Sequence, residues 1–381
     1  MKNETHRLGD YIREVNVRNR ELKVTQLLGL SIEKRFIPSI ANTIGTDMAG
    51  YKIVRRRQFA YVPVTSRNGE KITVALLEDC DEAIISQAYT VFEVVDCEKL
   101  LPEYLMMWFR RSEFDRYARF HSHGSAREVF DWDELCDVQL PVPNIERQRE
   151  IVSEYETLTR RIRLNEQMIE KLEATAQALY RHTFVDNIDK QNLPQGWHLA
   201  TLGEVCTINP KLALKTGNLA QYFDMDSLPI QGFFMDKVCI KEFNGGMKFQ
   251  NGDVLFARIT PCLENGKAAI VTDLNEYVIA FGSTEFIVLR GKLQKLTSIL
   301  ATLTRNEEFR AYAKSQMKGT DGRQRVDANA LLGYEIAIPD IKTLREIEDD
   351  LSKLFHQMHI LTNENREITE LQSLLLAKMG Q

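Results

Sequence analysis

The sequence has no apolar run that approaches the roughly 18 residues of a membrane span, which excludes an integral membrane protein. Its first ten residues are polar and lack the apolar stretch of a secretory signal, so we expect the chain to remain in the cytosol. The six cysteines are widely spaced and form no C-x-x-C pair, which excludes a zinc knuckle and a dense disulfide framework. We therefore expect free, buried thiols.

Basic charge is not in excess either. The 49 Lys and Arg residues face 54 Asp and Glu residues, and the net charge of −5 argues weakly against a nucleic-acid binder. The last 43 residues hold 5 basic and 8 acidic side chains, while the larger segments are near balance. A basic face on one side of a domain therefore remains possible.

The motifs of catalysis are also missing. Gly266-Lys267 lacks the earlier Gly and the following Ser or Thr of a phosphate-binding loop. Without such a loop, Asp81-Glu82-Ala83-Ile84 indicates a charged turn before a strand and not a helicase box. Asn209-Pro210 lacks the further Pro and aromatic residue with which an adenine methyltransferase grips a flipped base. We predict no catalytic centre in this chain.

Two histidine pairs have a spacing that could suit a metal ion, His121 with His123 and His356 with His359. Neither pair has a cysteine or an obvious third ligand nearby in the sequence. We therefore predict no metal site. The first pair is expected in a loop beside a binding surface, and the second on the flank of a helix.

The chain has a long internal repeat, and its length of 381 residues suits two to three domains. The segment Phe130–Ile145 matches Val326–Ile341 at an offset of 196 residues, with an Asp, a Leu and a Pro at the same positions. Arg149-Glu150-Ile151 matches Arg345-Glu346-Ile347 at the same offset. The chain therefore consists of two copies of one plan, a variable globular domain followed by a similar helix.

Each copy ends in a long helix with one apolar seam. Asn144 and Asp340 are good N-caps for these helices. Apolar residues recur downstream in alternating steps of four and three, which is a heptad pattern, over roughly 60 Å of helix. The seam consists of Ile151, Tyr155, Leu158, Ile162, Asn165, Ile169 and Leu172 in the first helix and Ile347, Leu351, Leu354, Met358, Leu361, Asn365 and Ile368 in the second.

We predict that these helices pair as an antiparallel coiled coil within the chain, and that Asn165 and Asn365 fix its register. The alternative is two ordinary amphipathic helices that each lie on their own domain. The fold class is mixed α/β, with two pseudo-repeated domains separated by the two helices. The expected boundaries are 1–142 for the first domain, 143–184 for the first helix, 185–196 for a linker, 197–338 for the second domain and 339–381 for the second helix.

Within the domains, alternating and β-branched residues predict strands, followed by one helix in each copy. The expected strands are 59–64, 72–77 and 89–95 in the first copy and 254–259, 268–272 and 285–289 in the second. The expected helices are 101–120 and 293–313.

This plan resembles the specificity subunit of type I restriction–modification systems. Leu193-Pro194-Gln195-Gly196-Trp197 looks like the entry into a target recognition domain of that family, and Gly252–Arg258 is similar to its characteristic strand. Gly124-Ser125-Ala126-Arg127 and Gly319–Arg325 resemble the loops that precede its helices. The first domain departs from the pattern, because no Trp opens it and Tyr61-Val62-Pro63 replaces Phe256-Ala257-Arg258.

The resemblance implies a subunit without catalysis of its own. Each domain would read one half of an asymmetric, two-part site in double-stranded DNA, and the helices would set the unread gap. Two modification subunits and, in the restricting complex, two restriction subunits would be its partners. S-adenosylmethionine, ATP and Mg would belong to those partner subunits, and no cofactor is expected here.

Candidate DNA contacts are Arg and small polar residues in loops, because hydroxyls suit phosphate oxygens while Arg and Gln can read base edges. The candidates are Arg55, Arg56, Arg57, Arg67, Ser125, Arg127, Arg258, Thr320, Arg323, Gln324 and Arg325. Two other functions stay open. One is a coiled-coil scaffold whose domains bind protein, and the other is an autonomous DNA methyltransferase or nuclease.

Overall fold

The computed structural model describes residues 5–39, 46–66, 69, 71–124, 127–186, 188–235, 239–274, 278–292, 296–319 and 324–380. Its contacts divide the chain into two compact units. The first unit comprises residues 1–160 and 368–381, and the second comprises residues 161–367. Among the described residues, no helix is both long and apolar enough to cross a membrane.

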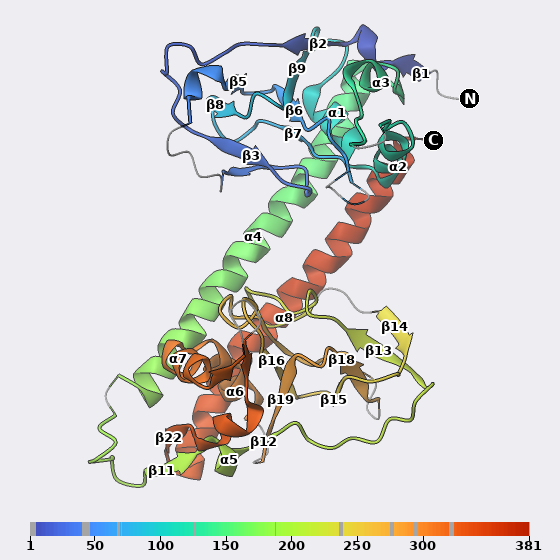
Figure 1. The fold of residues 1–381 in the computed structure, drawn as a ribbon. Helices are drawn as coiled ribbons and strands as arrows, with labels where there is room; N and C mark the ends of the chain where they lie inside the picture. The colour runs from blue at the N-terminus through green and yellow to red at the C-terminus, as the bar shows by residue number, and fades with distance from the viewer. Residues whose placement is uncertain are drawn as a thin grey trace. The chain divides into compact units, whose positions relative to one another are not determined.

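The described part of the first unit contains one four-stranded sheet and three strand pairs (Figure 1). The terminal pair is β1 (Thr5–Arg7) with β10 (Gln139–Pro141). One antiparallel sheet has the order β2 (Ile12–Val15), β9 (Thr90–Val94), β6 (Phe59–Tyr61) and β7 (Val74–Leu76). The other strands are the pair β3 (Leu28–Leu30) with β4 (Phe36–Pro38) and the pair β5 (Lys52–Arg55) with β8 (Glu82–Ile85).

A parallel bridge between Leu27 and Ile84 connects the pair β3-β4 with the pair β5-β8. The four strands therefore lie side by side in the order β4-β3-β8-β5 and form a second sheet. The amide of Ile84 donates to the carbonyl of Gln26 at 2.8 Å across this junction.

The second unit repeats this topology strand for strand. Its terminal pair is β11 (His198–Thr201) with β22 (Glu335–Ile338). Its first sheet has the order β12 (Cys206–Ile208), β19 (Phe286–Gly291), β16 (Val254–Ala257) and β17 (Ala268–Ile270). Its second has the order β14 (Cys239–Glu242), β13 (Leu219–Phe223), β18 (Ala280–Gly282) and β15 (Met247–Phe249), with β13 parallel to β18.

The repeat extends to single hydrogen bonds. The amide of Leu8, in the turn after β1, donates to Val138 at 2.8 Å, and that of Leu202, which opens the short helix α5 (Leu202–Val205), donates to Tyr334 at 2.8 Å. The structural repeat therefore includes the regions where the two sequences barely match.

The prediction of a single helix at this position in each domain is wrong, because the structure has two consecutive helices there. Helices α1 (Pro102–Arg110) and α2 (Ser112–Phe120) replace 101–120, and α6 (Thr297–Arg305) and α7 (Glu307–Ser315) replace 293–313. Arg111 and Asn306 separate the members of each pair with extended backbone. Asn306 then caps α7 by accepting from the amides of Glu308 and Phe309. A third short helix, α3 (Trp132–Cys136), follows in the first unit.

The expected strands are present but shorter or shifted by a few residues. The first sheet of each unit buries one apolar face against the helix pair, with Phe59, Phe92 and Phe109 in mutual ring contact in the first unit. Val254, Phe256 and Leu300 lie in the matching core of the second unit.

Each domain is followed by one long helix, α4 (Ile145–Phe184) and α8 (Ile341–Lys378). The predicted caps are confirmed, since Asn144 accepts from the amide of Arg147 at 2.9 Å and Asp340 accepts from Lys342 at 3.0 Å. The two helices pair antiparallel, and none of the predicted seam residues is exposed.

A polar cluster interrupts the apolar seam in the second unit. Asn165 is 3% exposed and donates to Asn365 at 2.8 Å and to Glu364 at 3.0 Å. Arg161 adds a two-pronged ion pair with Glu364 at 2.8 and 3.1 Å. In the first unit, Gln372 donates to Thr159 at 2.8 Å across the same pair of helices. Such polar contacts are satisfied in one register of the pair and lost in others.

The two long helices also contact the domains. Each helix therefore pairs with the other, as predicted, and also lies on its own domain, as in the alternative. In the second unit, Glu173 of α4 forms an ion pair with Arg305 at the end of α6, with N and O 2.5 Å apart. Both side chains are nearly buried, at 15% and 6% exposure. Arg305 also donates to the carbonyls of Gly266 and Pro229 and stacks on Phe233. Desolvation lowers the pKa of Arg305, and the Glu173 carboxylate opposes that shift.

The first turn of the domain helix is held from the long helix in both units. Glu348 of α8 accepts from the amides of Ser298 and Ile299 of α6 at 2.8 and 2.9 Å. Gln148 of α4 accepts from the amide of Leu101, just before α1, at 2.8 Å and donates to Lys99. Both side chains are buried, so these free helical amides are satisfied by another element and not by water.

We expect Glu173→Ala to lower the free energy of unfolding of the second unit by about 3–5 kcal/mol, because it leaves the Arg305 charge buried without its partner. Arg161→Ala, which breaks the exposed pair with Glu364, is the matched control and should have a much smaller effect. The measurement is urea unfolding followed by Trp197 fluorescence, with Trp108 and Trp132 replaced by Phe. Equal shifts for the two variants would contradict the difference assigned here between a buried and an exposed pair.

Burial raises the pKa of Glu348 above its usual value, while the amides of Ser298 and Ile299 oppose the shift. A carboxyl with a raised pKa in the folded state contributes stability that is complete below its ordinary pKa of 4.5 and is lost as the pH rises through the raised value. The stability of Glu348→Gln relative to the native chain should therefore increase with pH across this acidic window. Urea unfolding at a series of pH values measures it.

Asp340→Asn supplies a control of opposite sign. Hydrogen bonds from Thr343 lower the pKa of Asp340, so its contribution is present above the ordinary pKa and is lost as the pH falls. If both variants followed the same pH trend, the role given to Glu348 would be wrong.

Candidate nucleic-acid interface

Each unit builds a small hairpin after its second domain helix, and these hairpins carry the loops singled out in the sequence. In the first unit, His123 and Val129 exchange both backbone hydrogen bonds, at 3.0 and 2.9 Å. In the second, β20 (Met317–Lys318) pairs antiparallel with β21 (Arg325–Val326). Ser125, Thr320 and Arg323, as well as Arg67, lie outside the described residues. The other candidates can be placed.

A second contact attaches each hairpin to the segment directly after β6 or β16. Val64 bridges Val129 in the first unit, and Ile259 bridges Arg325 in the second. The amide of Phe130 donates to Pro63 at 2.9 Å, and the amide of Val326 donates to Arg258 at 2.9 Å. Pro63 therefore occupies the position of Arg258, which places Tyr61-Val62-Pro63 where the second copy has Phe256-Ala257-Arg258.

The second hairpin brings Arg258, Gln324 and Arg325 together through their backbones. The carbonyl of Gln324 accepts from the amide of Thr260 at 3.2 Å. Arg325 reaches Glu285 with its Nε, 2.8 and 2.9 Å from the two carboxylate oxygens, and the carboxylate raises its pKa. The Nε of Arg258 is buried and has no hydrogen-bond partner among the described residues.

Carboxylates also border this hairpin. Lys318 lies 3.4 Å from Asp327. A hydrogen bond from the amide of Asn329 lowers the pKa of Asp327, with Lys318 contributing less. The hairpin surface therefore carries both basic and acidic side chains, and its Lys318 and Arg325 lie close to carboxylates.

In the first unit, Arg127 is exposed and makes no ion pair or hydrogen bond with the described part of the chain. The two histidines of this region converge on one carboxylate, with His121 Nδ1 2.9 Å and His123 Nε2 3.5 Å from Glu134. His121 also stacks on Tyr117. Within the described residues, no three His, Cys, Asp or Glu side chains are arranged to hold a metal ion.

The triple-basic run lies elsewhere in the first unit, and all its guanidinium groups face acids. Arg55 is 3.8 Å from Glu82, and Arg56 is 3.0 Å from Asp81. Arg57 forms a two-pronged pair with Glu103 of α1. These three arginines are therefore neutralised locally, and the structure does not bring them to the hairpin.

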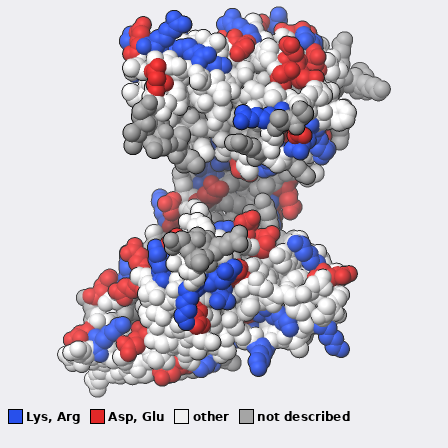
Figure 2. Space-filling model, in the orientation of Figure 1, with Lys and Arg blue, Asp and Glu red and all other residues white. Residues whose placement is uncertain are grey.

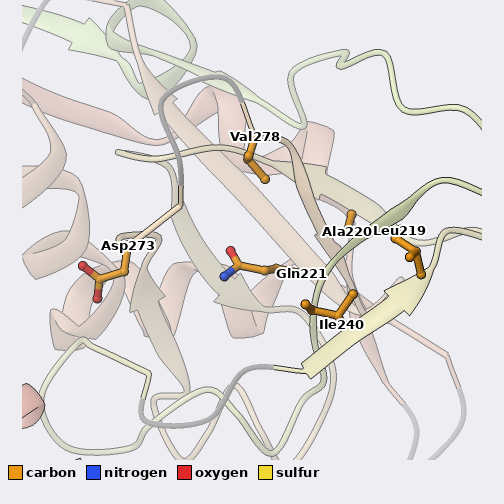
Figure 3. Close-up of a pocket in the computed structure, with 6 residues that line it drawn as sticks. All are labelled: Leu219, Ala220, Gln221, Ile240, Asp273 and Val278. Atoms are coloured by element: carbon orange, nitrogen blue, oxygen red, sulfur yellow. The ribbon is translucent and has the colours of Figure 1, made fainter.

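The second unit also has a pocket of about 320 Å³. Figure 3 shows Gln221 pointing from β13 toward the segment that carries Asp273, with Ile240 of β14 beside it. Leu219, Ala220 and Val278 complete the lining. Asp273 lies 3.0 Å from His359 of α8, so this ionisable lining group already has a partner.

Residues 47–174 and 194–370 match the family model described as type I restriction modification DNA specificity domain. The chain belongs to this family. The resemblance seen in its motifs is thereby confirmed, and both copies of the repeat take part in the match.

Individual relatives of this specificity-domain chain align over part of their length. It is 31% identical over 170 residues to the type I restriction enzyme EcoEI specificity subunit of Escherichia coli, which is 42% of this chain and 28% of that protein. It is 33% identical over 163 residues to the EcoAI specificity subunit of the same species, 41% of this chain and 27% of that protein. The aligned part therefore spans less than a third of either relative.

A solved structure supports the fold of this family member over its full length. The type I restriction–modification S subunit from M. genitalium is 12% identical, and the match covers 99% of this chain and 95% of that one with a TM-score of 0.56. At this identity the match concerns the fold alone.

Gly124 should be indispensable for the first hairpin of this specificity-domain chain. Its φ of +134° is accessible to glycine, and a Cβ there would overlap the carbonyl oxygen of Arg127. We expect Gly124→Ala to open the hairpin, with loss of hydrogen-exchange protection at the amides of His123 and Val129. Gly69 is the control, because it also has positive φ but nothing within 4 Å of its Cβ position. Retained protection in Gly124→Ala would show that the close approach is not required.

Proposed function

We propose that this chain is the DNA-specificity subunit of a type I restriction–modification complex. Each unit reads one half of an asymmetric, two-part site in double-stranded DNA, and the chain has no catalysis of its own. The observation that carries the proposal is the duplicated plan, in which two domains of identical topology and different surface each lead into one long helix. The family match in both copies supports it.

The hairpins are the proposed reading elements. They occupy matched positions in the two units, yet one carries Arg127 beside two histidines and the other carries Lys318, Gln324 and Arg325. Because guanidinium, amide and imidazole groups present different donors to base edges, two such hairpins select different half-sites. The target recognition domains are then residues 1–142 and 197–338.

The helices are proposed to set the gap between the half-sites and to dock the partners. A rigid helix pair converts its length into a spacing in base pairs, much as dimer geometry sets half-site spacing elsewhere. The partners would be two modification subunits and, in a restricting complex, two restriction subunits. S-adenosylmethionine, ATP and Mg would be bound by those partners, which also flip the base to be methylated.

Deleting the gene in its native host and mapping modified adenines by long-read sequencing tests the proposal. We expect the loss of one asymmetric, two-part motif, and its return when the gene is restored. Restoring the gene with Arg127→Ala should reduce or relax recognition in one half of that motif, because this exposed guanidinium is free to contact DNA. Arg56→Ala is the control, since Arg56 already faces Asp81.

An unchanged methylome in a strain that expresses the gene would contradict the proposal and would favour a coiled-coil scaffold that binds protein. Equal effects of Arg127→Ala and Arg56→Ala would remove the first hairpin from the reading surface.

A further inference from the structure

The second sheet of the second unit, β14-β13-β18-β15, has a face on which lysine and aromatic side chains lie together. We call it the outer face. Paired residues of neighbouring strands share a face. The pairs Tyr222–Phe281, Lys248–Phe281 and Ala220–Lys241 therefore place these side chains on one side of β13, β14, β15 and β18. The opposite side carries Phe223 and Phe249 into the core.

Two lysines of this outer face lie on aromatic rings. Lys241 Nζ is 3.9 Å from the ring centre of Tyr222, and Lys248 Nζ is 4.9 Å from that of Phe243. Lys248 also donates to the carbonyl of Leu212 at 3.1 Å, which leaves further N–H groups of its ammonium unused. The rings hold the ammonium groups in place without neutralising them.

The segment before β13 packs on this face through Leu214, and it carries two exposed lysines, Lys211 and Lys215. We call these four lysines, Lys211, Lys215, Lys241 and Lys248, the lysine face. No carboxylate of the described residues forms an ion pair with any of them. Figure 2 shows several blue side chains, with a few red ones among them, on a mostly white surface on the side of the second unit where β13 and β14 lie.

Asp224, which directly follows β13, is an acid close enough for Lys241 to affect its charge. Its carboxylate accepts from the amide and the hydroxyl of Ser227, at 2.9 and 2.8 Å. These hydrogen bonds lower the pKa of Asp224, and Lys241 contributes less. Asp224 is thus engaged by its own turn, which leaves the charge of Lys241 available.

We propose that the lysine face binds the phosphate backbone of double-stranded DNA. This inference rests on the proposed function and adds a contact that carries no sequence information. Lysine is a compact charge that suits phosphate oxygens, and clustered lysines without carboxylate partners are the electrostatic footprint of backbone binding. The arginines of the first unit's triple-basic run, in contrast, already face acids.

The first unit lacks the counterpart of Lys248. Ile53 pairs with Ile84 in β5 and β8, where the second unit pairs Lys248 with Phe281. The matching face of the first unit therefore presents isoleucine at the position of Lys248. Phosphate binding on one side would orient the asymmetric subunit on its site and leave base reading to the hairpins.

The test uses the complex assembled with its modification subunits and a labelled duplex that carries its methylation motif. Binding constants are measured over a range of salt concentrations for the native complex and for Lys241→Gln/Lys248→Gln. The slope of log K against log salt should fall in magnitude by about 0.9 for each lysine removed. The preference for the motif over a scrambled duplex should be unchanged.

Two further variants keep the result interpretable. Lys99→Gln/Lys314→Gln removes two exposed lysines that already face Asp96 and Glu264, and it should leave the slope near the native value. Lys241→Arg/Lys248→Arg retains the charges and should restore the native slope. Restoration by arginine would separate lost charge from a damaged fold.

The outcomes distinguish the two proposals. If the native complex showed no salt-dependent, motif-selective binding, the proposed function itself would fail. If it did bind selectively while Lys241→Gln/Lys248→Gln kept the native slope, the lysine face would be overturned. Loss of the modification subunits from that variant, with an unchanged slope, would make the face a protein-docking surface and would also overturn it.

Discussion

Two helices of 40 and 38 residues, each apolar along one seam, are stable only when that seam is buried, and the rest of the fold is arranged around this requirement. Each helix provides the partner for the other, so the seam is covered within one chain. The cluster of Asn165, Glu364 and Asn365 then gives the pair a register, because those polar groups lose their hydrogen bonds in any other. The proposed role of the helices, to set the gap between two half-sites, requires both a fixed length and a fixed register.

Besides the seam, each long helix has side chains that contact the globular domains. Glu173 pairs with Arg305 at the end of α6, and Glu348 accepts hydrogen bonds from amides at its start. Gln148 accepts a hydrogen bond from the amide that precedes α1. The two units solve the same problem with different chemistry, a neutral amide in one and buried carboxylates in the other. A buried charge is costly unless it is paired, so the second domain is fixed to its helices by interactions that tolerate little displacement. In the first domain, Val152 and Tyr155 of α4 add apolar contacts with the domain core.

The sequence reveals the parts of this fold that depend on periodicity. The helix caps, the seam and the repeat offset follow from residue spacing alone, and the topology repeats even where the sequences diverge. The break between α1 and α2 could not be foreseen, because no Pro or Gly marks it and Arg111 is held by stacking on Trp108. Cross-strand partners were equally hidden. Asp253 pairs with Arg290 in the second unit, whereas Gln58 and Glu93 meet at the same place in the first. Such pairs depend on register, which one sequence does not contain.

Charge shows most clearly why the candidate site is harder to predict than the fold. A net charge of −5 suggests a poor ligand for DNA, and a run of three arginines suggests a good one. Both expectations are based on charge along the sequence, whereas the electrostatic field at a surface depends on which charges lie close together in space. The arginine run is paired with Glu82, Asp81 and Glu103, while Lys241 and Lys248 lie on aromatic rings of one sheet and have no carboxylate partner among the described residues. Which cations the fold leaves unpaired is therefore determined by strand order and not by composition.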